Sequence, residues 1–145
     1  MRQHIIVPFD NSDSAREALR VAIEMAQKYK EKILLLNVQS KFTTPHTKVF
    51  FNDSDMRDYQ QALYEEAITS GVRLLEESGI EFETKLLIGF AQDEIFKEAE
   101  HQQIRCIVMG SRGHSAFVGS VLGSVSQGVL YRANCPVMVV PSKQK

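Results

Sequence analysis

The residues best suited to chemistry gather in one glycine-rich segment between positions 110 and 126. It holds four of the chain's eight glycines, Gly110, Gly113, Gly119 and Gly123. Glycine lets the backbone approach a ligand closely and adopt positive φ, so amide N–H groups can converge on an anion. Ser124 and Ser126 add hydroxyl donors, Arg112 adds a cation, and a helix starting at 124 would place Val125 and its neighbours at a positive dipole end. We interpret the segment as a phosphate cradle.

Two alternatives for this segment stay open. It can be a plain turn in which Ser124 only caps a helix, and His114 can touch a phosphate or lie in solvent. Two better-known phosphate motifs are absent from the sequence: there is no Gly-x4-Gly-Lys-Ser/Thr loop and no Gly-x-Gly-x-x-Gly after the first strand. Neither Ser111 nor Ser115 has an evident general base, so nucleophilic catalysis is not predicted.

Asp10 is the second candidate residue, at the end of the first apolar run. Its carboxylate can accept from a ribose hydroxyl or help to hold Mg²⁺ beside phosphates. It can equally cap the helix that follows. A calcium loop starting at Asp10 is excluded, because its sixth position is Ala15 rather than Gly and its twelfth is Val21 rather than Glu.

Five short apolar runs alternate with helix-period stretches, and these elements must position the candidates. We expect strands at 5–9, 33–38, 82–88, 104–109 and 137–140. N-cap candidates for the first helix lie at 11–14, where Ser14 with Glu17 has capping-box spacing. Further helices are expected along a stripe from 64 to 75 ended by Gly79, at 92–102 and at 124–133, with a long loop at 40–53. The alternation predicts an α/β, doubly wound parallel sheet with helices on both faces. Ligands then bind beyond the carboxyl ends of the strands.

Length and composition limit the class of protein. A chain of 145 residues suits a single domain spanning 1–145. The net charge of −1 argues against holding nucleic acid or anionic lipid by bulk basic charge. The apolar runs are strand-sized and the N-terminus has no signal-peptide profile, so we expect no membrane span. Cys106 and Cys135 are interpreted as buried thiols in a reducing compartment, which predicts a cytoplasmic protein.

Three motifs together resemble a known family. Gly110-x2-Gly113, nine residues, then Gly123-Ser124 matches the Gly-x2-Gly-x9-Gly-Ser/Thr signature of ATP-binding, UspA-like universal stress proteins. The first strand with Asp10, and the last strand between its two prolines, resemble that family's opening and closing strands. The resemblance implies a five-stranded parallel sheet in the order 3-2-1-4-5. The first and fourth strands would then be neighbours, and Asp10 would face the glycine-rich segment.

The resemblance also implies roles for single residues. Asp10 would lie near the ribose or a nucleotide-bound Mg²⁺, and the backbone of Val38 would contact adenine. The phosphates would be surrounded by Gly110, Arg112, Gly113, His114, Gly123, Ser124, Val125 and Ser126. A homodimer through the last strand, Val137–Val140, is implied as well. Many members have Gly where this chain has Asn11, which tolerates the left-handed conformation and should keep the turn.

The function expected from these residues and this resemblance is binding of ATP or another adenine nucleotide with Mg²⁺. The protein would act as a stress-response regulatory switch with little or slow hydrolysis, because no lysine or catalytic base is evident near the site. One alternative is an enzyme, a slow ATPase or an adenylyl-transfer protein using Asp10 and Arg112. Another is a dimeric scaffold that binds no nucleotide and uses its glycines only to shape a turn.

Overall fold

Helices and strands alternate along the chain in the computed structural model, which describes residues 3–41, 52–101, 103–112 and 122–142. The elements in order are β1 (His4–Pro8), α1 (Asp13–Tyr29), β2 (Lys32–Gln39), α3 (Asp53–Ser78), β3 (Phe82–Ile88), α4 (Ala91–His101), β4 (Ile104–Gly110), α5 (Ser124–Arg132) and β5 (Val137–Val140). Every predicted strand is present to within one or two residues. The predicted 40–53 loop falls mostly on 42–51, outside the described residues.

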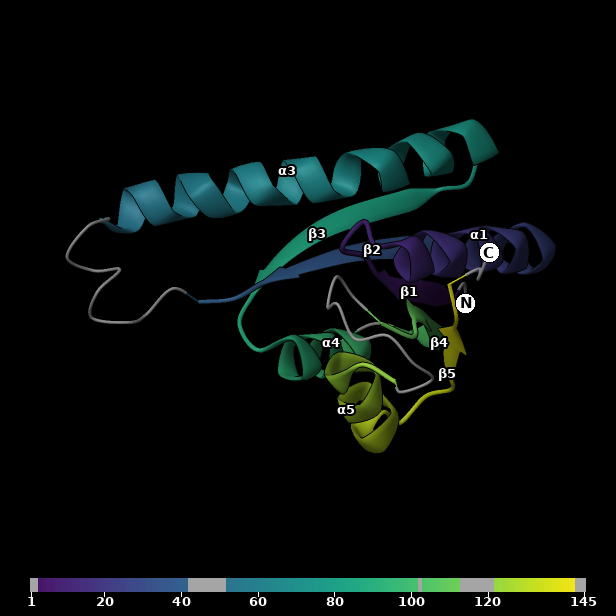
Figure 1. Ribbon diagram of the computed structural model, residues 1–145. Coiled ribbons are helices and arrows are strands. Elements are labelled where there is room, and N and C mark those ends of the chain that lie inside the picture. Colours follow the sequence, from purple (N-terminus) through teal and green to yellow (C-terminus); the bar gives the residue numbers. More distant parts are fainter. Residues whose placement is uncertain (1–2, 42–51, 102, 113–121, 143–145) are drawn as a thin grey trace.

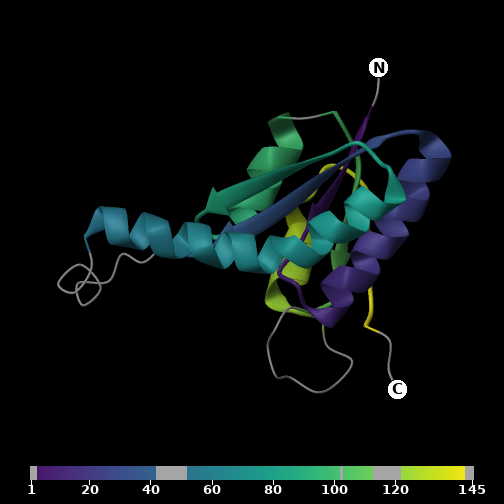
Figure 2. The ribbon, with the colours of Figure 1, turned by 90° about the horizontal axis from the view of Figure 1, so that it is seen from above.

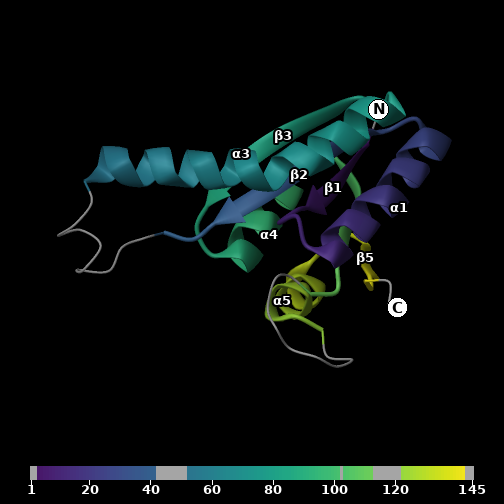
Figure 3. The ribbon, with the colours of Figure 1, turned by 45° about the horizontal axis from the view of Figure 1, so that its top comes forward.

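The five strands form one parallel sheet in the order β3-β2-β1-β4-β5, which confirms the predicted fold class. The reversal of direction along the sheet falls at β1, which pairs with β2 on one side and β4 on the other. Helices α1 and α3 cover one face, and α4 and α5 lie side by side on the other (Figures 1 and 3). Among the described residues, no helix is long and apolar enough to span a membrane.

The core has two halves, one on each face of the sheet. Successive residues of a strand point to opposite faces, so Ile5 and Val7 pack under α1 while Ile6 packs under α4 and α5. All three side chains are fully buried. A central strand covered on both faces must be apolar throughout, which explains why β1 shows no alternation of polar and apolar residues.

The helix ends differ in part from the expectation. Ser12, rather than Ser14, is the N-cap of α1 and accepts from the N–H of Ala15 at 3.2 Å, so the predicted Ser14–Glu17 capping box is wrong. Asn11 has a φ of 64°, which confirms the left-handed turn. Gly79 ends α3 with a φ of 74°, as predicted. Helix α3 begins well before its apolar stripe, and its N-terminal part extends past the sheet (Figure 2).

Candidate functional site

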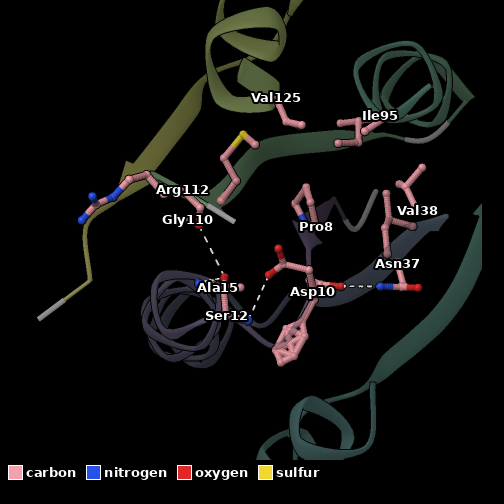
Figure 4. Close-up of a pocket in the computed structure, with 14 residues that line it drawn as sticks. Pro8, Asp10, Ser12, Ala15, Asn37, Val38, Ile95, Gly110, Arg112 and Val125 are labelled. Carbon is pink, nitrogen blue, oxygen red and sulfur yellow. Dashed lines mark hydrogen bonds between the residues drawn. The ribbon is translucent and has the colours of Figure 1, made fainter. Parts of the chain in front are cut away.

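A pocket opens beyond the carboxyl ends of β1, β2 and β4, where the strand order reverses. Its volume is about 170 Å³, more than ten times what one buried water needs by the same kind of measure, about 10–15 Å³. The pocket can therefore admit part of an organic ligand. Five of the residues predicted from the sequence line it: Asp10, Val38, Gly110, Arg112 and Val125 (Figure 4).

The other predicted residues lie elsewhere. Gly123, Ser124 and Ser126 form the cap and first turn of α5, next to the pocket-lining Val125. Gly113 and His114 lie outside the described residues. The structure thus brings Asp10, Val38 and the start of the glycine-rich segment to one place, although they are far apart in sequence, because β1 lies between β2 and β4.

Nine further lining residues were not among the site residues predicted from the sequence. They are Pro8, Phe9, Ser12, Ala15, Leu36, Asn37, Ala91, Ile95 and Met109. Most lie at the carboxyl end of a central strand or in the first turns of the helix that follows. Ligands of α/β sheets bind at that position, so the position alone could have identified these residues. The two from α4, Ala91 and Ile95, are four residues apart and so share one face of that helix.

The end of β1 is tied to β2 by Asn37. Its Nδ2 donates to the carbonyl of Phe9 at 2.9 Å, and its Oδ1 accepts from Gln39 Nε2 at 2.5 Å. Both polar atoms of this buried amide are engaged within the protein. Asn37 therefore holds the pocket wall in place.

Asp10 does accept a bond from the helix start. Its Oδ1 accepts from the N–H of Ser12 at 3.0 Å, an Asx turn that leads into α1 (Figure 4). This contact fits the capping role left open by the sequence and is compatible with a second role toward a ligand. No cluster of three or more potential metal ligands occurs among the described residues.

The chain leaving β4 is held from two sides by hydrogen bonds to its carbonyl groups. We call Gly110–Arg112 the exit segment. The Oγ of Ser126 donates to the carbonyl of Gly110 at 2.8 Å, and the N–H of Gly123 donates to that of Ser111 at 2.8 Å. The Oγ of Ser14 donates to the carbonyl of Arg112, and the Oγ of Ser12 approaches the same oxygen at 3.4 Å.

Two expectations about this segment change. Ser126 is 2% exposed and its hydroxyl donates to the carbonyl of Gly110, so in this structure the hydroxyl is not directed at a ligand. The guanidinium of Arg112 points away from the pocket, toward the β5 side, so only the backbone end of Arg112 lies beside Asp10 (Figure 4). The cation that the sequence placed on a phosphate is thus directed elsewhere in this structure.

The start of α5 keeps the character of an anion site. Its cap residue is Gly123, which has no side chain to bond the first amides of the helix. Those amides have no acceptor within the helix, and the helix dipole makes this end positive. Gln92 Nε2 donates to the carbonyl of Ser124 at 2.9 Å and so ties this turn to α4. Val125 brings the turn to the pocket.

Comparison with known proteins identifies the family. The model of the universal stress protein family matches residues 1–141. The chain belongs to the universal stress protein family. A universal stress protein of Thermus aquaticus is 30% identical over 141 residues, covering 97% of this chain and 99% of the relative.

Solved structures agree with this assignment. Universal stress protein UspA from Lactobacillus plantarum has a TM-score of 0.81 at 26% identity, covering 97% of this chain and 99% of that one. An Arabidopsis thaliana universal stress protein with AMP bound has a TM-score of 0.70 at 24% identity, covering 97% and 92%. The second likeness supports the fold.

Proposed function

We propose that this universal stress protein binds an adenine nucleotide in the pocket beyond β1, β2 and β4. The observation that carries the proposal is the meeting of Asp10, Val38 and the exit segment beside the uncapped start of α5. Universal stress proteins of the same fold have been solved with AMP, cAMP and dAMP. Those ligands belong to the other proteins and support a nucleotide of the same class here.

The base would lie against the end of β2. The carbonyl of Leu36 accepts from the N–H of Phe9, so it points toward β1. Alternate residues of a strand direct their N–H and C=O to the same side, so those of Val38 also point that way, beyond the last residue pair of β1 and β2. The N–H and C=O of Val38 thus offer a donor and an acceptor side by side, and these match the N1 acceptor and the amino donor of adenine. Guanine presents the opposite pattern.

The ribose and phosphates would follow from that placement. Asp10 lies between the end of β2 and the exit segment (Figure 4), where a carboxylate can accept from a ribose hydroxyl. The phosphates would then reach the first amides of α5. Among the pocket-lining residues in the described ranges, Asp10 is the only carboxylate. Mg²⁺ would accordingly be held mainly by the nucleotide's own phosphates, with Asp10 as its one protein ligand.

We propose that the bound nucleotide regulates the protein and is not rapidly hydrolysed by it. The pocket-lining residues in the described part of the chain include no lysine or histidine, and the one carboxylate there, Asp10, is assigned above to the ribose or Mg²⁺ rather than to proton transfer. The nucleotide would act as a ligand of a stress-response switch with little or slow hydrolysis. We further propose that the protein is a single domain located in the cytoplasm. We also propose that it forms a homodimer through β5, because β5 is an edge strand and its Met138 is half exposed.

The test is direct identification of the ligand. Freshly purified protein is denatured and any released nucleotide identified, and calorimetry then compares ATP, AMP and GTP. Ala91→Trp should remove binding by filling the pocket, while Ala62→Trp, at an exposed position of α3, should leave it unchanged. Absence of any adenine-nucleotide binding at millimolar concentration, or full binding by the Ala91→Trp variant, would overturn the proposal.

A further inference from the structure

The three consecutive carbonyls of the exit segment all accept hydrogen bonds from the protein. Ser126 reaches it from α5 on one face of the sheet, and Ser14 reaches it from α1 on the other. The carbonyl between them accepts from the N–H of Gly123. Ser14 and Ser126 are only 3% and 2% exposed, so neither hydroxyl is available to a ligand in solution.

The orientation of these carbonyls matters for an anion. A carbonyl oxygen is the negative end of the peptide dipole, and turned toward a phosphate it would oppose binding, most strongly in a site shielded from water. A hydroxyl group that donates to the carbonyl oxygen keeps that oxygen turned away from the phosphate and so prevents the repulsion. Because the peptide unit is planar, fixing the carbonyl of Arg112 also fixes the orientation of the peptide group at the end of the exit segment.

Gly110 makes this arrangement possible on the α1 side. A Cβ at position 110 would lie 2.7 Å from the backbone carbon of Ser14 and 2.8 Å from the backbone nitrogen of Ala15. Only a residue without a side chain lets the first turn of α1 approach closely enough for Ser14 to reach the carbonyl two residues beyond. The glycine therefore serves a contact between α1 and β4.

From these contacts we infer that Ser14 and Ser126 are positioning residues for phosphate binding. They hold the exit segment with its carbonyls turned into the protein, so that the site favours the phosphates of a nucleotide over a neutral nucleoside. The inference rests on the proposed function, since it names the residues that make the same pocket select a charged ligand. It differs from the sequence expectation, in which Ser126 itself contacts the phosphates.

The experiment compares ligands that share a base and ribose. Calorimetry measures ATP, AMP and adenosine binding to wild type, Ser14→Ala and Ser126→Ala. Ser78→Ala is the matched control, because the Ser78 hydroxyl bonds only nearby backbone at the end of α3, donating to the carbonyl of Leu75 and accepting from the N–H of Ile80. Loss of one hydrogen bond predicts about threefold to tenfold weaker ATP and AMP binding in each test variant. Adenosine should change by less than about twofold, and the control should match wild type for all three ligands.

A second measurement follows the exit segment without any ligand. Amide hydrogen exchange at Ser111 and Arg112 should be faster in Ser14→Ala than in the Ser78→Ala control, because the carbonyl of Arg112 loses its main donor. Unchanged exchange there would overturn the positioning role. An equal loss of affinity for adenosine and ATP would show that the serines only support the fold, which also overturns it. If wild type binds no adenine nucleotide, the proposed function fails, and exchange alone then decides whether the serines hold the segment.

Discussion

A methyl group added at Gly110 provides the sharpest test of how α1 is seated on β4. In Gly110→Ala the new Cβ would meet backbone atoms of Ser14 and Ala15 at 2.7 and 2.8 Å. Backbone atoms of a helix cannot swing aside as the end of a side chain can. Among the glycines that the structure describes, positive φ occurs at Gly79 and Gly89 but not at Gly110, so the cost of the substitution is steric.

The expected size follows from two contributions. Overpacking a well-filled contact costs about 1–3 kcal/mol. Moving α1 away also breaks the bond from Ser14 to the carbonyl of Arg112, which adds about 1 kcal/mol. Gly110→Ala should therefore lower the free energy of unfolding by about 2–4 kcal/mol. Urea denaturation followed by far-UV circular dichroism measures this as a lower midpoint at an unchanged slope.

Two other glycines calibrate the result. Gly79→Ala meets nothing within 4 Å but places alanine at a φ of 74°, which costs about 1–2 kcal/mol. Gly128→Ala overlaps only the flexible amide end of Gln92. It gains about 1 kcal/mol of helix propensity and loses a similar amount with the Gln92 bond to α5, so little net change is expected. If Gly110→Ala costs less than Gly79→Ala, the close packing of α1 on β4 is wrong.

Three further predictions concern other parts of the molecule. Asn11→Gly keeps the left-handed turn but removes an acceptor shared by α1 and α3, so chemical denaturation should show a loss of about 1 kcal/mol, and Asn11→Ala a further 1–2 kcal/mol. Burial raises the pKa of the Cys106 and Cys135 thiols. A thiol reagent at neutral pH should thus react slowly with both and first with the less buried Cys135, and equal rates would contradict this. The hydrogen bond from Lys32 lowers the pKa of Glu83. Stability from this pair should be present above the unfolded pKa of the carboxyl and disappear as pH falls through the folded pKa, and Lys32→Met should raise the Glu83 pKa in an NMR titration.

Much of the fold was predictable because its rules are local. The apolar run of β1 indicates a strand covered on both faces, and its three central residues are buried. Gly79 was predictable as a left-handed position from its place after a helix, and Asn11 from the family resemblance, because many members have Gly there. The strand order came from the family resemblance, since alternation by itself does not choose among parallel orders.

The remaining features depend on contacts between distant segments. Ser14 fits a capping box by its spacing, yet its hydroxyl bonds the carbonyl of Arg112, 98 residues away. A contact over so many residues leaves no pattern in the sequence around Ser14. The Arg112 side chain likewise points toward β5, a strand that the local sequence does not identify as its neighbour (Figure 4). The early start of α3 does depend on a local feature, because Asn52 caps the helix and accepts from the N–H of Asp55 at 2.8 Å. The apolar stripe used to predict this helix begins after that cap.

The net charge of −1 fits a site of this kind. Its candidate contacts are backbone groups of Val38, the first amides of α5 and one carboxylate, while the guanidinium of Arg112 points away. Such a site depends on the size of nearby residues more than on their charge. Gly110 must be small so that α1 can approach, and Ser14 must be small yet able to donate. A phosphate site can therefore exist in a chain without excess positive charge, because helix termini and oriented peptide groups supply the field.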